Sequence, residues 1–368
     1  MEPTAAYISH KNLKHNIGLI RKAIGSRRIM AVVKANAYGH GDIEVARTAV
    51  ESGCEMLGVA LPAEGIRLRD QGIDVPVLVF GAQLPENFAA AAQAGLMMTV
   101  TSPEQVAWLE NHPLPVPLKV HVKIDSGMNR VGFAGKACLP YIRRLENLDH
   151  IRIEGLYSHF ATSDEPDLTY ARKQLARFAD VAAEVQRQLG RKLIVHMANS
   201  GAIMQLPEAY FDMVRPGIML YGYDPDPNYV IGWDLKPVMS FHSRLGLIKL
   251  VPANEPVSYG RRYYTREATY IGVIPVGYAD GFDRSNTNNA CVLIDNTPYP
   301  LVGTVCMDMF MVNLGTELKC AAGDEVVIYG GDGDAPVNIR QIAKRLGTIP
   351  YEITCRVSGR VPRMHLYD

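Results

Sequence analysis

The sequence predicts an α/β protein in which a (β/α)8 TIM-type barrel is followed by a mostly β C-terminal domain. Two observations lead to this fold class. About eight short apolar runs alternate with stretches of helical spacing up to about residue 235, and the pattern then changes to β-branched and aromatic runs bounded by turn residues. An open doubly wound sheet is the alternative, but no G-x-G-x-x-G motif follows the first apolar run.

The barrel is expected over residues 1–233. Its strands are expected at residues 28–33, 56–61, 75–80, 95–100, 117–124, 151–157, 192–197 and 213–220. Helical patterns lie between them at residues 42–53, 85–95, 102–111 and 168–190, with Pro, Ser or Asp near their starts.

The second domain is expected over residues 234–368, after a proline-containing connector at residues 223–237. Strand-like runs occupy residues 268–282, 290–315 and 323–334. Helical spacing returns at residues 338–347. This composition predicts a mostly β unit.

Composition argues against several classes of partner. Lys and Arg number 38 and Asp and Glu number 38, so no net positive charge is available to hold a nucleic acid. No apolar run approaches the roughly 18 residues of a membrane span, and lysines interrupt the first 20 residues before a signal sequence could form. The six cysteines are scattered without a C-x-x-C pair, so we expect reduced thiols, no metal site and a cytoplasmic protein.

The ends of the expected strands, where barrel enzymes place their active sites, carry mostly polar residues. The residues there are Lys34, Tyr38, Lys123, Asp125, Asn129, Arg130, His159, His196, Asn199, Ser200 and Arg215, with Gly217 and Ile218 beside them. A single Lys or Arg at a strand end is usually just solvated. Their coincidence predicts one polar, mostly cationic mouth.

Three of these positions suggest a chemistry. Lys34 ends the run "AVVK", and a largely dry barrel with neighbouring cations would lower the pKa of its amine and make it a nucleophile or base. Lys123 alternates with Val122 and Ile124, which predicts that it points into the barrel and needs a partner or loses its charge. Gly217, after Pro216, allows close backbone approach to a phosphate, although this signal alone is weak.

The segment "AVVKANAYGHG" is similar to the pyridoxal-phosphate attachment segment of the alanine racemases, a family that the chain resembles. The likeness continues in order through "KIDSGMNRVGF", "SHFATSD", "HMANSGA", "DMVRPGIMLYG", "VSYGRRY", "PVGYADGF", "VGTVCMDMFMVNL" and "IPYEITCRVSGRVPR". It therefore covers nearly the whole chain and both expected domains.

The resemblance implies that pyridoxal 5'-phosphate is the cofactor and that Lys34 holds it as an internal aldimine. It further implies a phosphate site made of Tyr38, Ser200, Tyr351, Gly217 and Ile218. Arg215 would face the pyridine nitrogen and leave it unprotonated, because a guanidinium has no proton-accepting atom. Barrel relatives that decarboxylate amino acids carry an acidic residue there instead.

The resemblance also implies two acid/bases on opposite faces of the cofactor, Lys34 and Tyr259. Hydrogen bonds from Tyr259 to His159 and on to Arg215 would assist the tyrosine. Arg130 and the Met307 segment would bind the substrate carboxylate. The family's lysine at the position of Lys123 is often carbamylated, so the resemblance implies this modification for Lys123. The residues implied to narrow the entrance for a small side chain are Tyr278, Cys306, Met307, Asp308 and Tyr351.

The implied function is the interconversion of L-alanine and D-alanine, for cell-wall peptidoglycan or for alanine catabolism. The implied assembly is a homodimer in which Tyr259 and Met307 come from the partner subunit, so that the active sites are shared. The alternatives are a racemase of broader or serine specificity, a non-enzymatic pyridoxal-phosphate carrier, and a barrel aldolase that uses a lysine imine. The carrier would lack the second domain, and the aldolase would lack the yellow colour of the cofactor.

Overall fold

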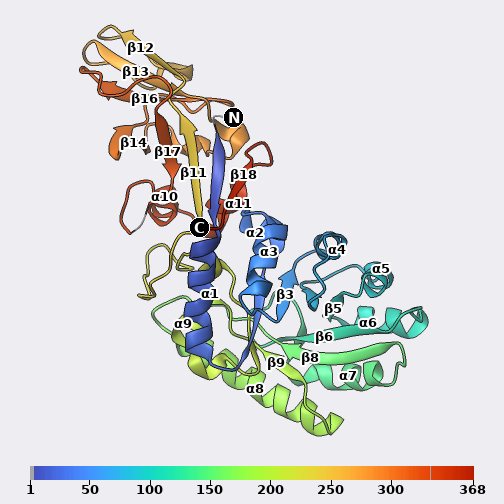
Figure 1. Ribbon diagram of the computed structural model, residues 1–368. Helices are drawn as coiled ribbons and strands as arrows, with labels where there is room; N and C mark the ends of the chain where they lie inside the picture. Colours follow the sequence, from blue (N-terminus) through green and yellow to red (C-terminus); the bar gives the residue numbers. More distant parts are fainter. Residues whose placement is uncertain (1–3, 332) are drawn as a thin grey trace.

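Eight parallel strands close into a barrel in the computed structural model, which describes residues 4–331 and 333–368 (Figure 1). Each strand pairs in parallel with the next, and the last returns to the first. In barrel order they are β2 (Arg28–Val32), β3 (Met56–Val59), β4 (Val77–Val79), β5 (Met97–Val100), β6 (Leu118–Asp125), β8 (Ile151–Tyr157), β9 (Ile194–His196) and β10 (Met213–Val214). The predicted barrel is confirmed. Seven of the eight strands fall within their predicted runs, and β6 extends one residue beyond its run of 117–124, to Asp125.

The barrel strands are readable as apolar runs because helices cover their outer face and side chains fill their inner face. Both β3 and β5 are buried at every position. The surrounding helices are α1 (His10–Ile24), α3 (Asp42–Glu51), α4 (Pro62–Asp70), α5 (Asn87–Gln93), α6 (Pro103–Asn111), α7 (Leu139–Glu146), α8 (Thr169–Leu189) and α9 (Ser200–Gln205). The start of α6 illustrates the local cause: the Ser102 hydroxyl accepts a hydrogen bond from the N–H of Gln105, and Pro103 occupies the first turn.

The second unit contains a six-stranded and a three-stranded sheet, as the predicted mostly β domain requires (Figure 1). Its elements are β11 (Met239–Arg244), β12 (Leu247–Val251), β13 (Thr269–Ile274), β14 (Cys291–Ile294), β15 (Thr297–Pro300), β16 (Phe310–Gly315), β17 (Glu325–Tyr329), α10 (Ile339–Leu346), α11 (Pro350–Arg356) and β18 (Arg363–Leu366). The two domains also contain a two-residue strand, β7 (Phe133–Ala134), and short 3-10 helices labelled η. These are η1 (Gly135–Cys138), η2 (Pro207–Ala209), η3 (Ile218–Tyr221), η4 (Tyr259–Arg261), η5 (Tyr278–Asp280) and η6 (Arg284–Asn286).

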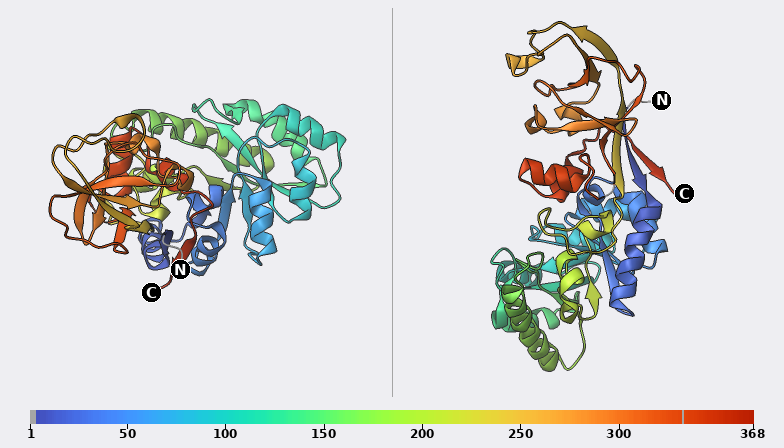
Figure 2. Two further views of the ribbon diagram at one scale, coloured as in Figure 1. Left: turned by 90° about the horizontal axis from the view of Figure 1, so that it is seen from above. Right: turned by 90° about the vertical axis from the view of Figure 1, so that its left-hand side faces the viewer.

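The first strand of the chain, β1 (Ala5–Ser9), belongs to the larger sheet of this second unit and not to the barrel. It pairs antiparallel with β11 and parallel with β18. Both chain ends therefore reach the same sheet, and Figure 2 places the two termini on the same side of the molecule. The range expected for the barrel, residues 1–233, includes β1, and no strand is predicted from the sequence at this position.

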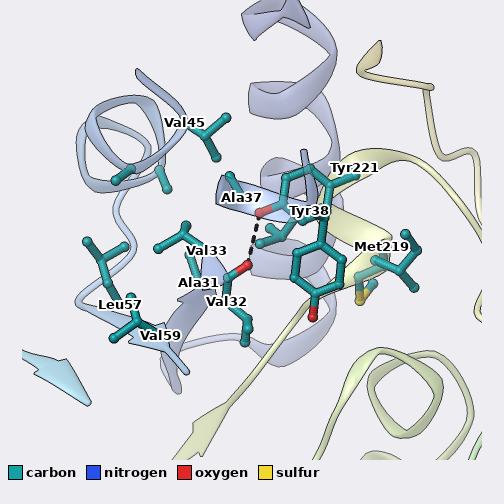
Figure 3. Packing of buried hydrophobic residues seen from close by; sticks show 14 of the residues in the cluster. Ala31, Val32, Val33, Ala37, Tyr38, Val45, Leu57, Val59, Met219 and Tyr221 are labelled. Atoms are coloured by element: carbon teal, nitrogen blue, oxygen red, sulfur yellow. Dashed lines mark hydrogen bonds between the residues drawn. The ribbon is translucent and has the colours of Figure 1, made fainter. Parts of the chain in front are cut away.

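Apolar side chains pack directly beneath the segment that follows β2 (Figure 3). Ala31, Val33 and Ala37 contribute to this buried core. The hydroxyl of Tyr221, on η3, donates a hydrogen bond to the Val32 carbonyl at 2.9 Å. This packing anchors the base of the segment that carries Lys34. Within the described ranges, 4–331 and 333–368, the helices are all too short or too polar to cross a bilayer.

Candidate active site

Lys34 lies two residues beyond the end of β2, at the start of the element labelled α2 (Lys34–Tyr38), and directly precedes one turn of left-handed backbone. Ala35, Asn36, Ala37 and Tyr38 have φ angles of 53°, 54°, 52° and 54°. This conformation costs roughly 1–2 kcal/mol for each residue that is not glycine. Such strain persists only where the surrounding structure holds it in place, and it is concentrated at functional sites.

Contacts from three directions hold the left-handed turn. The carboxylate of Glu64, on α4, accepts a hydrogen bond from the Ala35 N–H at 2.7 Å. The guanidinium of Arg363, on β18, donates to the Gly39 carbonyl at 2.9 Å. Gly39 also packs against α11, where a Cβ at this position would come within 2.1 Å of the Thr354 carbonyl oxygen. The second domain thus helps to position the loop that carries Lys34.

A cavity of about 560 Å³ opens at the C-terminal ends of the barrel strands. Its lining unites most of the residues predicted from the strand ends, namely Lys34, Tyr38, Lys123, Arg130, His159, Asn199, Ser200, Arg215 and Gly217, together with Tyr351, which the family resemblance implied. Tyr351 comes from α11 of the second domain. Among the described residues that line the cavity none is Asp or Glu, so the cavity suits an anionic ligand.

Burial and mutual repulsion weaken proton binding by the cavity lysines. Burial, followed by the nearby Arg130, lowers the pKa of the Lys34 amine. Lys123 is only 7% exposed, and burial and Arg215 hold its pKa well below the ordinary value. Its Nζ lies 4.9 Å from the centre of the Tyr157 ring. The lowered pKa favours the free-base form of both amines. The role of Lys34 as a nucleophile or base stays a prediction.

Arg215 is the centre of a buried hydrogen-bonded chain. It donates to the carbonyls of Ser158 and Met197, to His159 Nδ1 at 3.3 Å and to His196 Nδ1 at 2.9 Å. A guanidinium can only donate, so both Nδ1 atoms accept and each ring carries its hydrogen on Nε2. Burial and the charge of Arg215 hold the pKa values of both histidines well below 6.5, so both rings are neutral.

The chain of neutral rings continues away from the cavity to His121. His196 Nε2 lies 2.8 Å from His121 Nδ1 and donates to it. His121 must then carry its hydrogen on Nε2, which is buried without a partner among the described residues. Burial lowers the pKa of His121 to about 3, and that of Arg215 to about 10. Arg215 thus stays charged while the rings beside it stay neutral.

A cradle for an anionic group lies between β10 and α9. The Ser200 hydroxyl accepts a hydrogen bond from the Gly217 N–H at 3.0 Å. A Cβ on Gly217 would come within 2.7 Å of the Tyr38 hydroxyl, so only glycine leaves this space open. The rings of Tyr38 and Tyr351 lie 5.7 Å apart, and Ile218 begins η3 with its side chain buried. We call the cavity residues Lys34, Tyr38, Lys123, Arg130, His159, Ser200, Arg215, Gly217 and Tyr351 the barrel cluster.

The remaining predicted site residues lie together elsewhere, on the second domain. This β-domain cluster consists of Tyr259, Tyr278, Cys306, Met307 and Asp308, and none of the five lines the cavity. The Tyr278 N–H donates to the Cys306 carbonyl, and the Thr304 hydroxyl donates to the Tyr259 carbonyl. Tyr259 is 74% exposed and Met307 is 53% exposed. A single chain therefore gathers the predicted residues in two groups.

Tyr157, in the cavity lining, and Glu64, outside it, had not been singled out from the sequence. Tyr157 ends β8, stacks on His196 and has Arg215 over its ring at 5.3 Å. Its place at the end of a predicted apolar run could have indicated it. Glu64 lies beyond the cavity lining and gave no sequence signal, because its partners are backbone groups of two separate loops.

Comparisons with known proteins cover the whole of this architecture. The model of the alanine racemase N-terminal domain matches residues 8–225, and that of the C-terminal domain matches residues 238–365. Alanine racemase 2 of Caldanaerobacter subterraneus subsp. tengcongensis is 40% identical over 100% of this chain and 96% of its own. The alanine racemase of Geobacillus stearothermophilus is 42% identical over 91% of this chain and 86% of its own.

Solved structures agree with these sequence relatives. An alanine racemase of Clostridium difficile 630 superposes with a TM-score of 0.94 and 38% identity, covering 100% of this chain and 97% of the other. An alanine racemase of Bacillus anthracis with bound L-Ala-P superposes with a TM-score of 0.93 and 33% identity, covering 100% and 96%.

Proposed function

Because the chain belongs to the alanine racemase family and is an isomerase that interconverts L-alanine and D-alanine, we propose that it works through pyridoxal phosphate carried on Lys34. The observation that carries this proposal is the cationic cavity that surrounds the strained Lys34 turn. When bound, the cofactor withdraws electrons from the α-carbon of alanine and makes its proton removable.

The phosphate cradle supports this cofactor. Tyr38, Ser200 and Tyr351 and the backbone of Gly217 and Ile218 would hold the phosphate. The missing Cβ of Gly217 lets the Tyr38 hydroxyl lie close to this backbone, next to the Ser200 hydroxyl that accepts the Gly217 N–H. Burial raises the pKa of Tyr38 and Tyr351, so both hydroxyls remain hydrogen-bond donors at neutral pH.

Arg215 would face the ring nitrogen of the cofactor. The guanidinium keeps its protons, and its histidine neighbours are already committed as acceptors. It therefore supplies hydrogen-bond donors and no transferable proton at this position. A nitrogen left unprotonated limits electron flow into the ring and favours prompt return of the proton to the α-carbon.

Lys34 and Tyr259 would be the two acid/bases. Lys34 has a lowered pKa and can accept a proton as a free amine. His159 is neutral, accepts from Arg215 through Nδ1 and carries its hydrogen on Nε2, which leaves that N–H to donate to a tyrosine oxygen. Such a donor stabilises the phenolate form of Tyr259.

We propose that Tyr259 reaches this position from a second copy of the chain. In a symmetric dimer each barrel cluster would then be completed by the partner's β-domain cluster, which gives two shared sites. Tyr259, Leu247 and Met309 are exposed and line one groove on the second domain. Their exposure supports an interface, because a monomer seldom exposes several large apolar side chains beside one groove.

Substrate binding would use both clusters. Arg130 lines the cavity and would meet the alanine carboxylate together with the Met307 segment. Lys123, deeply buried among cations, fits carbamylation, since a carbamate would turn it into an anion beside Arg130. Tyr278, Cys306, Asp308 and Tyr351 would keep the substrate side chain small. Broader or serine specificity is the alternative that activity on serine would reveal.

The six cysteines are free in the structure, which supports work in a reducing compartment such as the cytoplasm. There the enzyme would supply D-alanine for peptidoglycan or serve alanine catabolism.

The test of the cofactor assignment is chemical trapping. Borohydride treatment of the yellow holoenzyme should fix pyridoxal phosphate on Lys34, and peptide mass spectrometry should locate the adduct. Lys34→Ala should lose both the adduct and racemisation, measured by chiral analysis after incubation with L-alanine. An adduct on any other lysine would contradict the proposal.

A further inference from the structure

Glu64 bridges the loops that follow two neighbouring barrel strands, β2 and β3. Its Oε1 accepts a hydrogen bond from the Ala35 N–H at 2.7 Å. Its Oε2 accepts from the N–H groups of Ala60 at 2.7 Å and Leu61 at 3.1 Å. The side chain comes from the first turn of α4. One carboxylate therefore ties the segment that carries Lys34 to the adjacent loop.

The bond to Ala35 acts on the peptide unit that begins at Lys34. The Ala35 N–H and the Lys34 carbonyl belong to one planar group, so fixing this N–H fixes the ψ angle of Lys34. Ala35 is also the first residue of the left-handed turn. Without its acceptor, the turn would lose the side-chain anchor at its first residue, and the direction of the Lys34 side chain would be less restricted.

Glu64 also places a negative charge near the amine. Arg130, Glu64, Cys355 and His159 are the titratable groups that interact with Lys34. Burial and Arg130 lower the pKa of the amine, whereas Glu64 and Cys355 raise it. The described cavity lining contains four Lys or Arg side chains, Lys34 included, and no carboxylic acid. Glu64 therefore supplies a negative charge that the lining lacks.

We propose that Glu64 is a positioning residue for the reaction, because it fixes the direction of the Lys34 side chain and stabilises the protonated form of its nitrogen. This inference rests on the proposed role of Lys34 as the residue that carries pyridoxal phosphate. Glu64 itself lies outside the cavity lining and touches neither substrate nor cofactor in this role.

The test separates the geometric effect from the charge effect with two variants. Glu64→Gln keeps the length of the side chain but removes the charge and leaves one accepting oxygen where the carboxylate has two. Glu64→Asp keeps the charge and shortens the reach, so that it cannot bridge both loops. The visible circular dichroism of bound pyridoxal phosphate reports its orientation, and a pH titration of its absorbance reports protonation of the Lys34 nitrogen.

For Glu64→Gln we expect a lower pH midpoint of the absorbance titration and a kcat reduced about 10- to 100-fold with KM changed less than about threefold. For Glu64→Asp we expect a midpoint near that of the wild type but visible circular dichroism reduced by about half. Rescue of the midpoint by Asp and not by Gln is an outcome that a purely structural role would not produce.

Glu55→Gln is the matched control. The Glu55 carboxylate accepts a hydrogen bond from the Ile29 N–H at 2.7 Å, at the opposite end of the same strand β2. Like Glu64→Gln, this variant replaces a carboxylate that accepts a backbone N–H by an amide. It also removes an ion pair with Arg21, and it should change neither the midpoint nor the circular dichroism. The inference is overturned if both Glu64 variants keep the wild-type spectra and lose no more kcat than Glu55→Gln. If borohydride fails to fix the cofactor on Lys34 in the wild type, the proposed function fails instead.

Discussion

Lys34 and Tyr259 are proposed to exchange protons with the same carbon atom, yet the fold surrounds them in opposite ways. The barrel cluster is enclosed: Arg215 is 4% exposed and its hydrogen bonds are made within one chain. The β-domain cluster is open, with Tyr259 at 74% exposure. A closed region can be organised before any ligand arrives, whereas an open one needs a second surface to exclude water.

Under the proposed function, one chain would build the half of the site that holds the cofactor and would present the other half to a partner subunit. In the barrel cluster, burial is the main cause of the lowered pKa values of Lys34 and His159, and it keeps the His159 ring neutral. No comparable burial acts on Tyr259 within one chain. The acid/base pair would become complete only when the β-domain cluster of a partner covers the cavity.

The largest effect should come from separating the two clusters onto different chains. Lys34→Ala and Tyr259→Phe should each be nearly inactive, because each direction of racemisation uses both groups. Equal amounts of the two variants, unfolded and refolded together, should give roughly half mixed dimers, each with one intact site. Activity should recover to roughly a quarter of wild type. Mixed dimers seen by mass spectrometry without recovered activity would mean that each site is built within one chain.

A smaller but still large effect should follow from changing the charge at the centre of the barrel cluster. Arg215→Glu should protonate the cofactor's ring nitrogen, lower racemisation roughly a hundredfold or more and raise transamination relative to it. Arg215→Lys is the control, since it keeps the positive charge and should lose activity without gaining transamination. Partitioning that stays the same in Arg215→Glu would show that Arg215 does not act on the ring nitrogen.

The smallest effect concerns stability, and it tests the burial that distinguishes the two regions. The pKa of His121 falls to about 3 on folding, first because of burial and then because of Arg215. An unfolded chain, with a pKa near 6.5, takes up this proton first as the pH falls. The free energy of unfolding should therefore decrease between pH 6.5 and 3, by up to about 1.4 kcal/mol per pH unit for this group.

His121→Asn keeps an acceptor for His196 and removes the titrating group, so it should flatten this dependence in denaturant titrations at several pH values. The exposed His112 is the control, because His112→Asn leaves the buried chain unchanged. An equally steep dependence in His121→Asn would mean that this ring is not buried as neutral imidazole.

The barrel and most of the barrel cluster could be predicted from the amino-acid sequence alone. Parallel strands that are buried on both faces must be apolar along their whole length, and residues that follow such strands must meet at one end of the barrel. This is why Lys34, Lys123, His159 and Arg215 could be predicted to share a site. Family resemblance added Tyr351 and the β-domain cluster, which no strand pattern indicates.

Three features of the fold and the site could be seen only in the tertiary structure. The pairing of β1 with β11 and β18, the left-handed turn at Ala35 and the bridge through Glu64 all depend on contacts between segments distant in sequence. Local propensity favours a right-handed turn for Ala35 and Ala37, and long-range hydrogen bonds and packing overrule it. Lys34 lines the cavity and Tyr259 does not, and this too depends on the whole fold, because the local sequence around each residue does not indicate where its element lies relative to the other.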